Sequence, residues 1–328
     1  MNVLAGDVGG TNARLALVEV MDGRAVIREQ RTYPSRAYTG LATIVRTFFA
    51  ETGARPERAC IGVPCPAAED ECRAANLPWR VDVGTLANEI AIASTALIND
   101  FTAIGHGIAL LGADDVETLQ AGEPKARAPI GLIGAGTGLG VGFLTWSNGR
   151  YEVHGSEGGH VGFAPRGERQ AGLARYLERE YGRVSSERVL SGPGIVDTYK
   201  YLATPGAGAA AETPAVRAEM QQDHPAAVIV RHAVAGTDAL CRETLDLFID
   251  ALGAAAGDLA LTVLARGGVY VGGGIAPRII DLLRAGGFLR GFLDKGRLSP
   301  YLARVPVRVI LNPHVGLLGA AAVAARVK

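Results

Sequence analysis

An acidic side chain and a hydroxyl stand inside a glycine-rich stretch near the start of the chain, Gly6-Asp7-Val8-Gly9-Gly10-Thr11-Asn12. Backbone N–H groups of such a turn can bind an anion, because glycine permits positive φ values and the close approach of a phosphate. A bare carboxylate beside a phosphate would repel it. Asp7 is therefore expected to act on the magnesium side of a nucleotide, binding Mg²⁺ directly or through its water molecules.

Two common phosphate-binding motifs are excluded. A Walker A loop needs a Gly-Lys dipeptide, which the chain lacks. A dinucleotide fingerprint needs G-x-G-x-x-G/A between a strand and a helix. The stretch GAGTGLGVG lacks that spacing, and GAGAAA at 206–211 has it only inside a segment rich in Pro, Ala and Gly. What remains is a turn between two antiparallel strands. An ordinary hairpin turn is the alternative, although Asp7, Thr11, Asn12 and Arg14 exceed the polar content that it needs.

A second turn of the same kind, Gly136-Thr137-Gly138, opens the other half of the chain. GDVGGTNARLALV and GAGTGLGVGFLT share the plan of strand, Gly/Thr-rich turn and strand. The repetition predicts a duplicated architecture in which both turns bind one phosphate-bearing ligand. A chance likeness between two glycine-rich hairpins is the alternative.

Groups suited to proton transfer and hydroxyl binding follow these turns. Asp100 comes directly after the apolar stretch TALIN and before a predicted helix, at the strand end where open α/β sheets bind ligands. Its carboxylate could accept the proton of an attacking hydroxyl, or only cap the helix. Glu157 and His160, separated by two glycines, offer an acceptor and a donor–acceptor to sugar-like hydroxyls. No H-E-x-x-H motif is present, so a metal site is not expected there.

The elements that must position these residues alternate between strand-like and helix-like stretches, which predicts an α/β architecture with a mostly parallel sheet. The expected strands include residues 3–8, 14–20, 25–33, 94–100 and 305–311, the strand within 58–66 that runs into a proline-marked loop, and the two around Gly136–Gly138. The expected helices include residues 41–52, 83–92, 101–112, 171–182, 238–264 and 315–328. The pattern-poor segment 203–226 is interpreted as a surface excursion between helices.

Length and composition limit the class of protein. A chain of 328 residues is long for one core, so two lobes are expected. Lys+Arg and Asp+Glu both number 33, which gives no electrostatic basis for a nucleic-acid or membrane partner. The four cysteines fit neither a disulfide framework nor a zinc site. The start of the sequence has no signal-like segment, so a cytoplasmic location is expected.

Six motifs, in this order, resemble those of bacterial glucokinases of the actin/hexokinase/Hsp70 superfamily: GDVGGTNARLALV, LINDFTAIGHGI, GAGTGLGVGFL, SEGGHVGFAP, ERVLSGPGIVDTY and GGVYVGGGIAPRI. The resemblance implies an α/β fold of two actin-like, ribonuclease H-like lobes, with mixed β-sheets flanked by helices and a ligand cleft between the lobes. The expected small lobe holds residues 1–110 and about 306–328, and the large lobe residues 111–305.

The same resemblance implies roles for individual residues. Asp100 becomes the general base, and the sugar-binding residues are Asn99, Asp100, Glu157, His160 and Glu187. ATP is expected at the two phosphate turns, with Gly273 and Gly274 on its adenosine side and Mg²⁺ at Asp7. A solvated surface glutamate is the alternative for Glu187. Relatives often have a small residue at Pro64 and an acidic residue at Gly162, and these differences could change loop rigidity or sugar preference.

The predicted activity is ATP-dependent phosphorylation of D-glucose at its 6-hydroxyl. A kinase of another hexose or amino sugar, such as mannose or N-acetylglucosamine, is the alternative, and ADP or polyphosphate as donor stays open. A related repressor–kinase family includes DNA-binding regulators, but its Cys-rich motif is missing after His160 and only six residues precede Asp7. A non-enzymatic sugar sensor is therefore less favoured. A homodimer is an open alternative, because the sequence locates no dimer surface.

Overall fold

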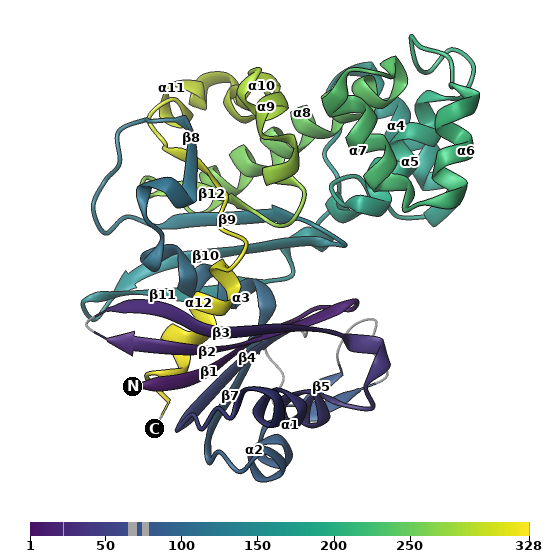
Figure 1. The fold of residues 1–328 in the computed structure, drawn as a ribbon. Coiled ribbons are helices and arrows are strands. Elements are labelled where there is room, and N and C mark those ends of the chain that lie inside the picture. Colours follow the sequence, from purple (N-terminus) through teal and green to yellow (C-terminus); the bar gives the residue numbers. More distant parts are fainter. Residues whose placement is uncertain (22, 65–70, 74–78, 328) are drawn as a thin grey trace. The chain divides into compact units, whose positions relative to one another are not determined.

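The computed structural model describes residues 1–21, 23–64, 71–73 and 79–327 (Figure 1). The chain forms two compact units. The first holds Met1–Val116, Val153–Gly155 and Asn312–Lys328, and the second holds Glu117–Glu152 and Ser156–Leu311. None of the helices within the described ranges is long and apolar enough to cross a membrane.

The first unit contains a five-stranded mixed sheet in the order β3-β2-β1-β4-β7. β1 pairs antiparallel with β2 and parallel with β4, and β4 pairs parallel with β7. The strands are β1 (Asn2–Val8), β2 (Asn12–Met21), β3 (Arg24–Pro34), β4 (Arg58–Val63) and β7 (Ser94–Asn99), with the small pair β5 (Glu71–Arg73) and β6 (Arg80–Asp82) apart from them. The helices are α1 (Leu41–Thr52), α2 (Val83–Ile90), α3 (Asp100–Gly107) and α12 (Val315–Ala324).

Alternating side chains along the strands fill two separate cores, because successive residues of a strand point to opposite faces of the sheet. Leu4 and Val8 of β1 belong to one core with residues of α1 and α2. Val3 and Ala5 belong to the other, with residues of α12. Figure 1 shows α12 and α3 along one face of this sheet and α1 and α2 beyond the other. The sheet is therefore buried on both sides, and its loops are left to carry polar groups.

The second unit is built on a six-stranded sheet in the order β11-β10-β9-β12-β13-β8. Its strands are β8 (Val116–Gln120), β9 (Ile130–Ala135), β10 (Leu139–Ser147), β11 (Arg150–Ser156), β12 (Gly268–Gly272) and β13 (Val307–Ile310). Its helices are α4 (Gly167–Tyr181), α5 (Gly192–Leu202), α6 (Pro214–Gln222), α7 (Pro225–Ala235), α8 (Ala239–Thr262), α9 (Ile280–Arg284), α10 (Gly287–Leu293) and α11 (Ser299–Leu302). β13 pairs with β12 and so lies in this unit, whereas the sequence-based boundary near residue 306 placed it in the small lobe.

The 24-residue helix α8 forms the centre of the second core, with residues buried around most of its circumference. Glycines let α10 lie close against it. A Cβ at Gly253 would lie 2.0 Å from the carbonyl oxygen of Phe288, and one at Gly291 would lie 2.1 Å from that of Asp250. Larger residues at these positions would force the two helices apart.

One segment has more regular structure than its pattern predicted. The segment 203–226, interpreted as a surface excursion between helices, contains α6 and the start of α7. Both helices begin with proline as their first residue, a position where the missing N–H costs nothing. Val216 is buried, and His232 Nε2 of α7 lies 2.6 Å from Glu219 Oε2 of α6. Tertiary packing thus stabilises a helix whose own sequence pattern is weak.

Candidate active site

The first glycine turn joins β1 to β2 and is held by a buried serine. The N–H of Gly9 donates to Asn12 O at 2.8 Å and closes the turn. Ser35, which is fully buried, donates its Oγ–H to Gly9 O at 2.8 Å and its N–H to Thr11 O at 2.9 Å. No described residue accepts a hydrogen bond from the N–H groups of Gly10 or Thr11. The turn therefore keeps its carbonyls on the protein and leaves two donors for an anion.

Asp7 precedes this turn on β1, directly opposite Arg14 on β2. Arg14 Nη1 lies 3.6 Å from Asp7 Oδ2 and donates to Pro313 O at 3.0 Å. Burial raises the pKa of the Asp7 carboxyl, and the Arg14 guanidinium opposes that shift. A Cβ at Gly316 would lie 3.5 Å from Asp7 Cγ, so α12 closes over the carboxylate. This packing explains why a carboxyl at the mouth of a turn is partly desolvated.

A single carboxylate fits Mg²⁺ better than it fits a metal held by protein alone. The described residues contain no group of three or more His, Cys, Asp or Glu placed to hold a metal ion. Mg²⁺ commonly keeps several water molecules and binds one or two carboxylates together with substrate phosphates. Asp7, whose side chain keeps 30% of its surface exposed, suits that donor set.

Asn99 and Asp100 stand where β7 ends and α3 begins. Asn99, not Asp100, caps the helix, since its Oδ1 accepts from the N–H groups of Phe101 at 2.9 Å and Thr102 at 3.0 Å. Asp100 is the first helical residue, half-buried, and its Oδ1 accepts from the Phe101 N–H at 2.8 Å. Capping, the alternative role considered for Asp100, is thus performed by its neighbour.

The strand register places both carboxylates at one edge of the first sheet. Asp7 on β1 pairs with Gly62 on β4, and Gly62 pairs with Ile98 on β7. Asp7 and Asp100 therefore lie at the carboxyl ends of two parallel strands on either side of β4, about 10 Å apart by two strand spacings. A Cβ at Gly62 would lie 3.4 Å from Asp100 Cα, so glycine lets α3 begin close to the sheet. This edge is the one that binds ligands in open α/β sheets.

The second glycine turn, in the second unit, joins β9 to β10. The N–H of Gly136 donates to Gly138 O at 2.8 Å, and the N–H of Gly192, at the start of α5, donates to Gly136 O at 2.8 Å. Glu187 Oε2 accepts from the Leu139 N–H at 2.9 Å. A Cβ at Gly138 would lie 2.5 Å from that oxygen. The carboxylate of Glu187 thus supports the turn itself, a contact that the sequence did not predict.

Glu187 also joins the predicted sugar-binding residues. His160 Nε2 lies 3.8 Å from Glu157 Oε2, and His160 Nδ1 lies 3.8 Å from Glu187 Oε1. Glu157 precedes the short helix η4 (Gly158–His160), which His160 ends, and a Cβ at Gly159 would lie 2.0 Å from Leu139 O. The two glycines therefore let this helix lie flat against β10. Three residues from two parts of the sequence meet beside the second turn and offer oxygen and nitrogen atoms to a polyol.

The third glycine loop packs against the end of β9. Gly273 has a φ of +83°, and a Cβ on it would lie 2.3 Å from Ala135 O. The N–H of Ile275 donates to the same carbonyl at 3.3 Å. Gly274, by contrast, has open space where its Cβ would be. The loop thus stands beside the second turn within the same unit, and Gly273 is required there by both conformation and space.

The loop from His160 to α4 is held at both ends. Near its start, Arg183 Nη2 donates to His160 O at 2.7 Å, and Gly162 forms an antiparallel bridge with Ser185. The loop and the segment that leads to Glu187 therefore support each other.

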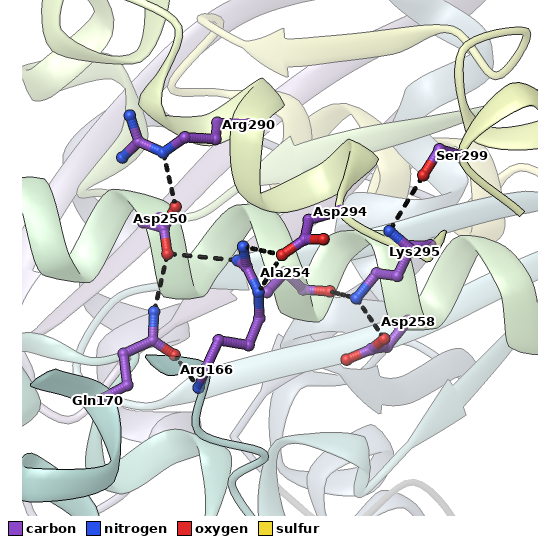
Figure 2. Close-up of polar contacts among 9 residues, drawn as sticks. All are labelled: Arg166, Gln170, Asp250, Ala254, Asp258, Arg290, Asp294, Lys295 and Ser299. Atoms are coloured by element: carbon purple, nitrogen blue, oxygen red, sulfur yellow. Dashed lines mark hydrogen bonds and ion pairs between the residues drawn. The ribbon is translucent and has the colours of Figure 1, made fainter. Parts of the chain in front are cut away.

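At the other end of the loop, Arg166 is tied to helices α8 and α10 (Figure 2). Its Nη1 lies 3.2 Å from Asp250 Oδ2, and its Nε donates to Asp294 Oδ2 at 3.0 Å. The N–H of Arg166 donates to Gln170 Oε1 at 2.9 Å, and Gln170 Nε2 donates to Asp250 Oδ2 at 2.8 Å. Arg290 Nε donates to the other oxygen of Asp250 at 3.2 Å. Asp250 thus anchors the loop that begins at His160.

Sequence reasoning did not find Ser35 or Arg166. Neither belongs to a motif, and each acts through a backbone group or helix distant in sequence. The only signal at Ser35 is a small hydroxyl two residues after the predicted strand 25–33. Arg166 offers none, because its partners lie 84 and 128 residues away.

Comparison with known proteins gives consistent likenesses. A family model described as Glucokinase matches residues 4–327. A glucokinase of Trichormus variabilis is 43% identical over 341 residues, with 99% of each chain covered. The crystal structure of a glucokinase from an Antarctic psychrotroph superposes with a TM-score of 0.84 at 33% identity, again with 99% of each chain covered. A ROK family glucokinase from Streptomyces griseus, solved with glucose and AMPPNP, has a TM-score of 0.67 at 20% identity over 99% of this chain and 100% of that one, a likeness of fold alone.

Proposed function

The chain belongs to the glucokinase family, and we propose that it transfers the γ-phosphoryl group of ATP to the 6-hydroxyl of D-glucose, with Asp100 as general base. The observation that carries the assignment of the base is the half-buried carboxylate of Asp100, at the same sheet edge as Asp7 and the first glycine turn. The relatives' names and their identity over nearly the full length support the reaction.

Asp100 would accept the proton of the 6-hydroxyl as its oxygen attacks phosphorus. The capping contacts of Asn99 fix the start of α3 and hence the position of Asp100. Asn99 is proposed to bind a neighbouring sugar hydroxyl. The N–H groups of Gly10 and Thr11 would bind phosphate oxygen. Mg²⁺, held on the side of Asp7, supplies charge neutralisation to the phosphates.

In the second unit, the turn Gly136–Gly138 and the loop at Gly273 and Gly274 are proposed to bind the nucleotide. Glu157 and His160 would bind vicinal sugar hydroxyls. Glu187 is proposed to serve both ligands, since Oε2 supports the turn at Leu139 while Oε1 lies on the side of His160. A carboxylate shared in this way would link sugar binding to the geometry of the phosphate turn.

ATP as donor is supported by the AMPPNP held in the Streptomyces griseus protein, an ATP analogue on the same fold. Mg²⁺ is proposed from the chemistry of Asp7. A cytoplasmic location and a homodimer remain predictions. No nucleic-acid or membrane partner is proposed, in line with the balanced charge of the chain.

Release of ADP, measured in a coupled assay with glucose, mannose, fructose and N-acetylglucosamine, tests this proposal. ATP and polyphosphate serve as alternative donors. We expect the highest kcat/KM with glucose and ATP, and none with either substrate omitted. A preference for the N-acetylated sugar would contradict the glucose assignment. Sugar binding without ADP release would instead support the regulatory alternative.

A further inference from the structure

A hollow of about 460 Å³ lies in the second unit, away from the glycine turns. Its walls come from the loop that leads into β9, the loop that leads into β12, and Tyr301 of α11. It therefore lies at the opposite end of β9 from the turn Gly136–Gly138. Its volume falls within the range of sites for small molecules. None of the residues assigned above to ATP or glucose lines it.

The charge around this hollow is positive. Lys125, Arg127 and Arg266 line it, and no acidic residue does so among the described residues of its wall. Glu123 lies nearby, with its Oε2 3.7 Å from Arg266 Nη2, but the same oxygen accepts from Arg304 Nε at 2.8 Å. Its charge is thus matched by a cation outside the hollow. The local excess of positive charge favours an anion.

Two buried polar atoms of the wall have no protein partner. Arg266 Nε and Tyr301 Oη are both inaccessible and make no hydrogen bond with any described residue. Buried donors are satisfied in the great majority of native proteins, so such atoms call for a partner. Burial raises the pKa of the Tyr301 hydroxyl, and the Arg266 charge opposes that shift. Both atoms lie under the wall of the hollow, out of reach of solvent.

The backbone of the wall is held in a rarely populated conformation. Arg127 and Leu264 have φ angles of +62° and +53°, and they are two of the four non-glycine residues with positive φ in the described chain. Hydrogen bonds between the two loops maintain it, from the Lys125 N–H to Arg266 O at 2.8 Å and from the Gly267 N–H to Pro129 O at 2.9 Å. Such strained residues gather at ligand sites because the surroundings fix them.

Apolar groups complete the hollow. Leu264 is 61% exposed and Pro129 lies in the same wall. The guanidinium of Arg127 lies 5.4 Å from the ring of Trp146, which itself is 37% exposed. A bound molecule would therefore meet apolar surface and cations together.

We propose that this hollow binds a small amphipathic anion, one with a phosphate or carboxylate group on an apolar ring. The anionic oxygens lie between Arg127, Arg266 and Lys125, where charge-assisted hydrogen bonds are strong. The ring covers Leu264 and Pro129. The site is separate from the proposed sugar and nucleotide sites and does not depend on their assignment.

Phenyl phosphate is the probe for this site, with benzoate as the carboxylate counterpart and inorganic phosphate as the head group alone. The chain has two tryptophans, so in a Trp79→Phe variant Trp146 reports on the hollow. We expect saturable binding of phenyl phosphate by calorimetry together with a change in Trp146 fluorescence. Inorganic phosphate should bind at least about tenfold more weakly, because it covers no apolar surface. Comparison with benzoate then shows which head group the cations prefer.

Arg127→Gln and Arg266→Gln should each weaken phenyl phosphate binding by about tenfold, the effect of one charge-assisted hydrogen bond. Arg175→Gln, which removes an exposed charge on α4, is the matched control and should change nothing. If Arg266→Gln fails to fold, Arg127→Gln and Lys125→Gln still test the site. Both side chains are exposed, so their replacement should leave the fold intact. Absence of saturable binding, equal affinity in the variants, equal affinity for inorganic phosphate, or displacement of the probe by ATP would each overturn the proposal.

Discussion

Replacement of Arg166 by Gln should loosen the loop that begins at His160. The ion pair with Asp294, whose side chain is 61% exposed, contributes at most about 1 kcal/mol. The contact with Asp250, whose side chain is 16% exposed, contributes about 1.5–3 kcal/mol. We therefore expect the free energy of unfolding to fall by about 2–3 kcal/mol.

The effect on catalysis should be uneven. The loop then keeps its bridge between Gly162 and Ser185 but loses the contacts of the Arg166 side chain with Asp250 and Asp294, so His160 is less ordered when glucose arrives. Ordering one additional residue on binding costs about 1–2 kcal/mol, which corresponds to a KM for glucose about tenfold higher. Because Asp100 lies on a different element, kcat should change by less than about threefold.

Lys295→Met provides the matched control. Lys295, also on the α8–α10 side, is only 9% exposed and donates to Asp258 at 2.5 Å and to Ala254 O at 2.9 Å (Figure 2). Its loss should lower stability by a comparable amount without reaching the loop. Steady-state kinetics give the KM for glucose of both variants, and urea unfolding gives their stability. A KM that rises equally in both, or in neither, would refute the role of Arg166 in positioning the loop.

Three further perturbations follow from the structure. Gly273→Ala should destabilise the protein by more than about 3 kcal/mol and weaken ATP binding, because its Cβ would overlap Ala135 O. Gly286→Ala is the control: Gly286 has a φ of +95° but open space around it, so this substitution should lower the free energy of unfolding in urea by only about 1 kcal/mol. Hydrogen bonds with His232 and Arg231 lower the pKa of the Glu219 carboxyl. These contacts therefore stabilise the fold above the ordinary carboxyl pKa, and the stabilisation is lost as pH falls through the lowered pKa. Glu219→Gln should therefore lower the midpoint of thermal unfolding at pH 7, and the difference from wild type should close in acid. Asp7→Asn should raise that midpoint, since burial disfavours the charged carboxyl, while lowering kcat/KM; a lower midpoint would contradict the cost of burial.

The parts of the fold that were predictable are those in which local pattern and tertiary structure agree. The predicted helix at 41–52 and the hairpins on either side of Gly9–Thr11 and Gly136–Gly138 are observed, because apolar periodicity and turn chemistry both specify them. Helix α6 was missed because its apolar side is short and its stability depends on packing against α7. The periodicity of a sequence carries no information on such packing.

The candidate site shows the same division. Asp100 follows a strand, so its place at a sheet edge could be inferred from the sequence. The contact of Glu187 with the Leu139 N–H could not, because 48 residues separate them and no periodicity relates them. The support of the first turn by Ser35 was equally invisible, since a buried hydroxyl that donates to a distant carbonyl leaves no mark in local composition.

The most direct test of the central claim is single-turnover phosphorylation of glucose by Asp100→Asn, with glucose affinity measured in parallel by calorimetry. Asp114→Asn, which alters an exposed carboxylate of the same unit, is the control. A general base contributes about 10²–10⁴-fold, so we predict a loss of at least about a hundredfold in the rate of phosphoryl transfer, with glucose Kd within about tenfold of wild type. A transfer rate within about threefold of wild type would contradict the assignment of Asp100 as the base.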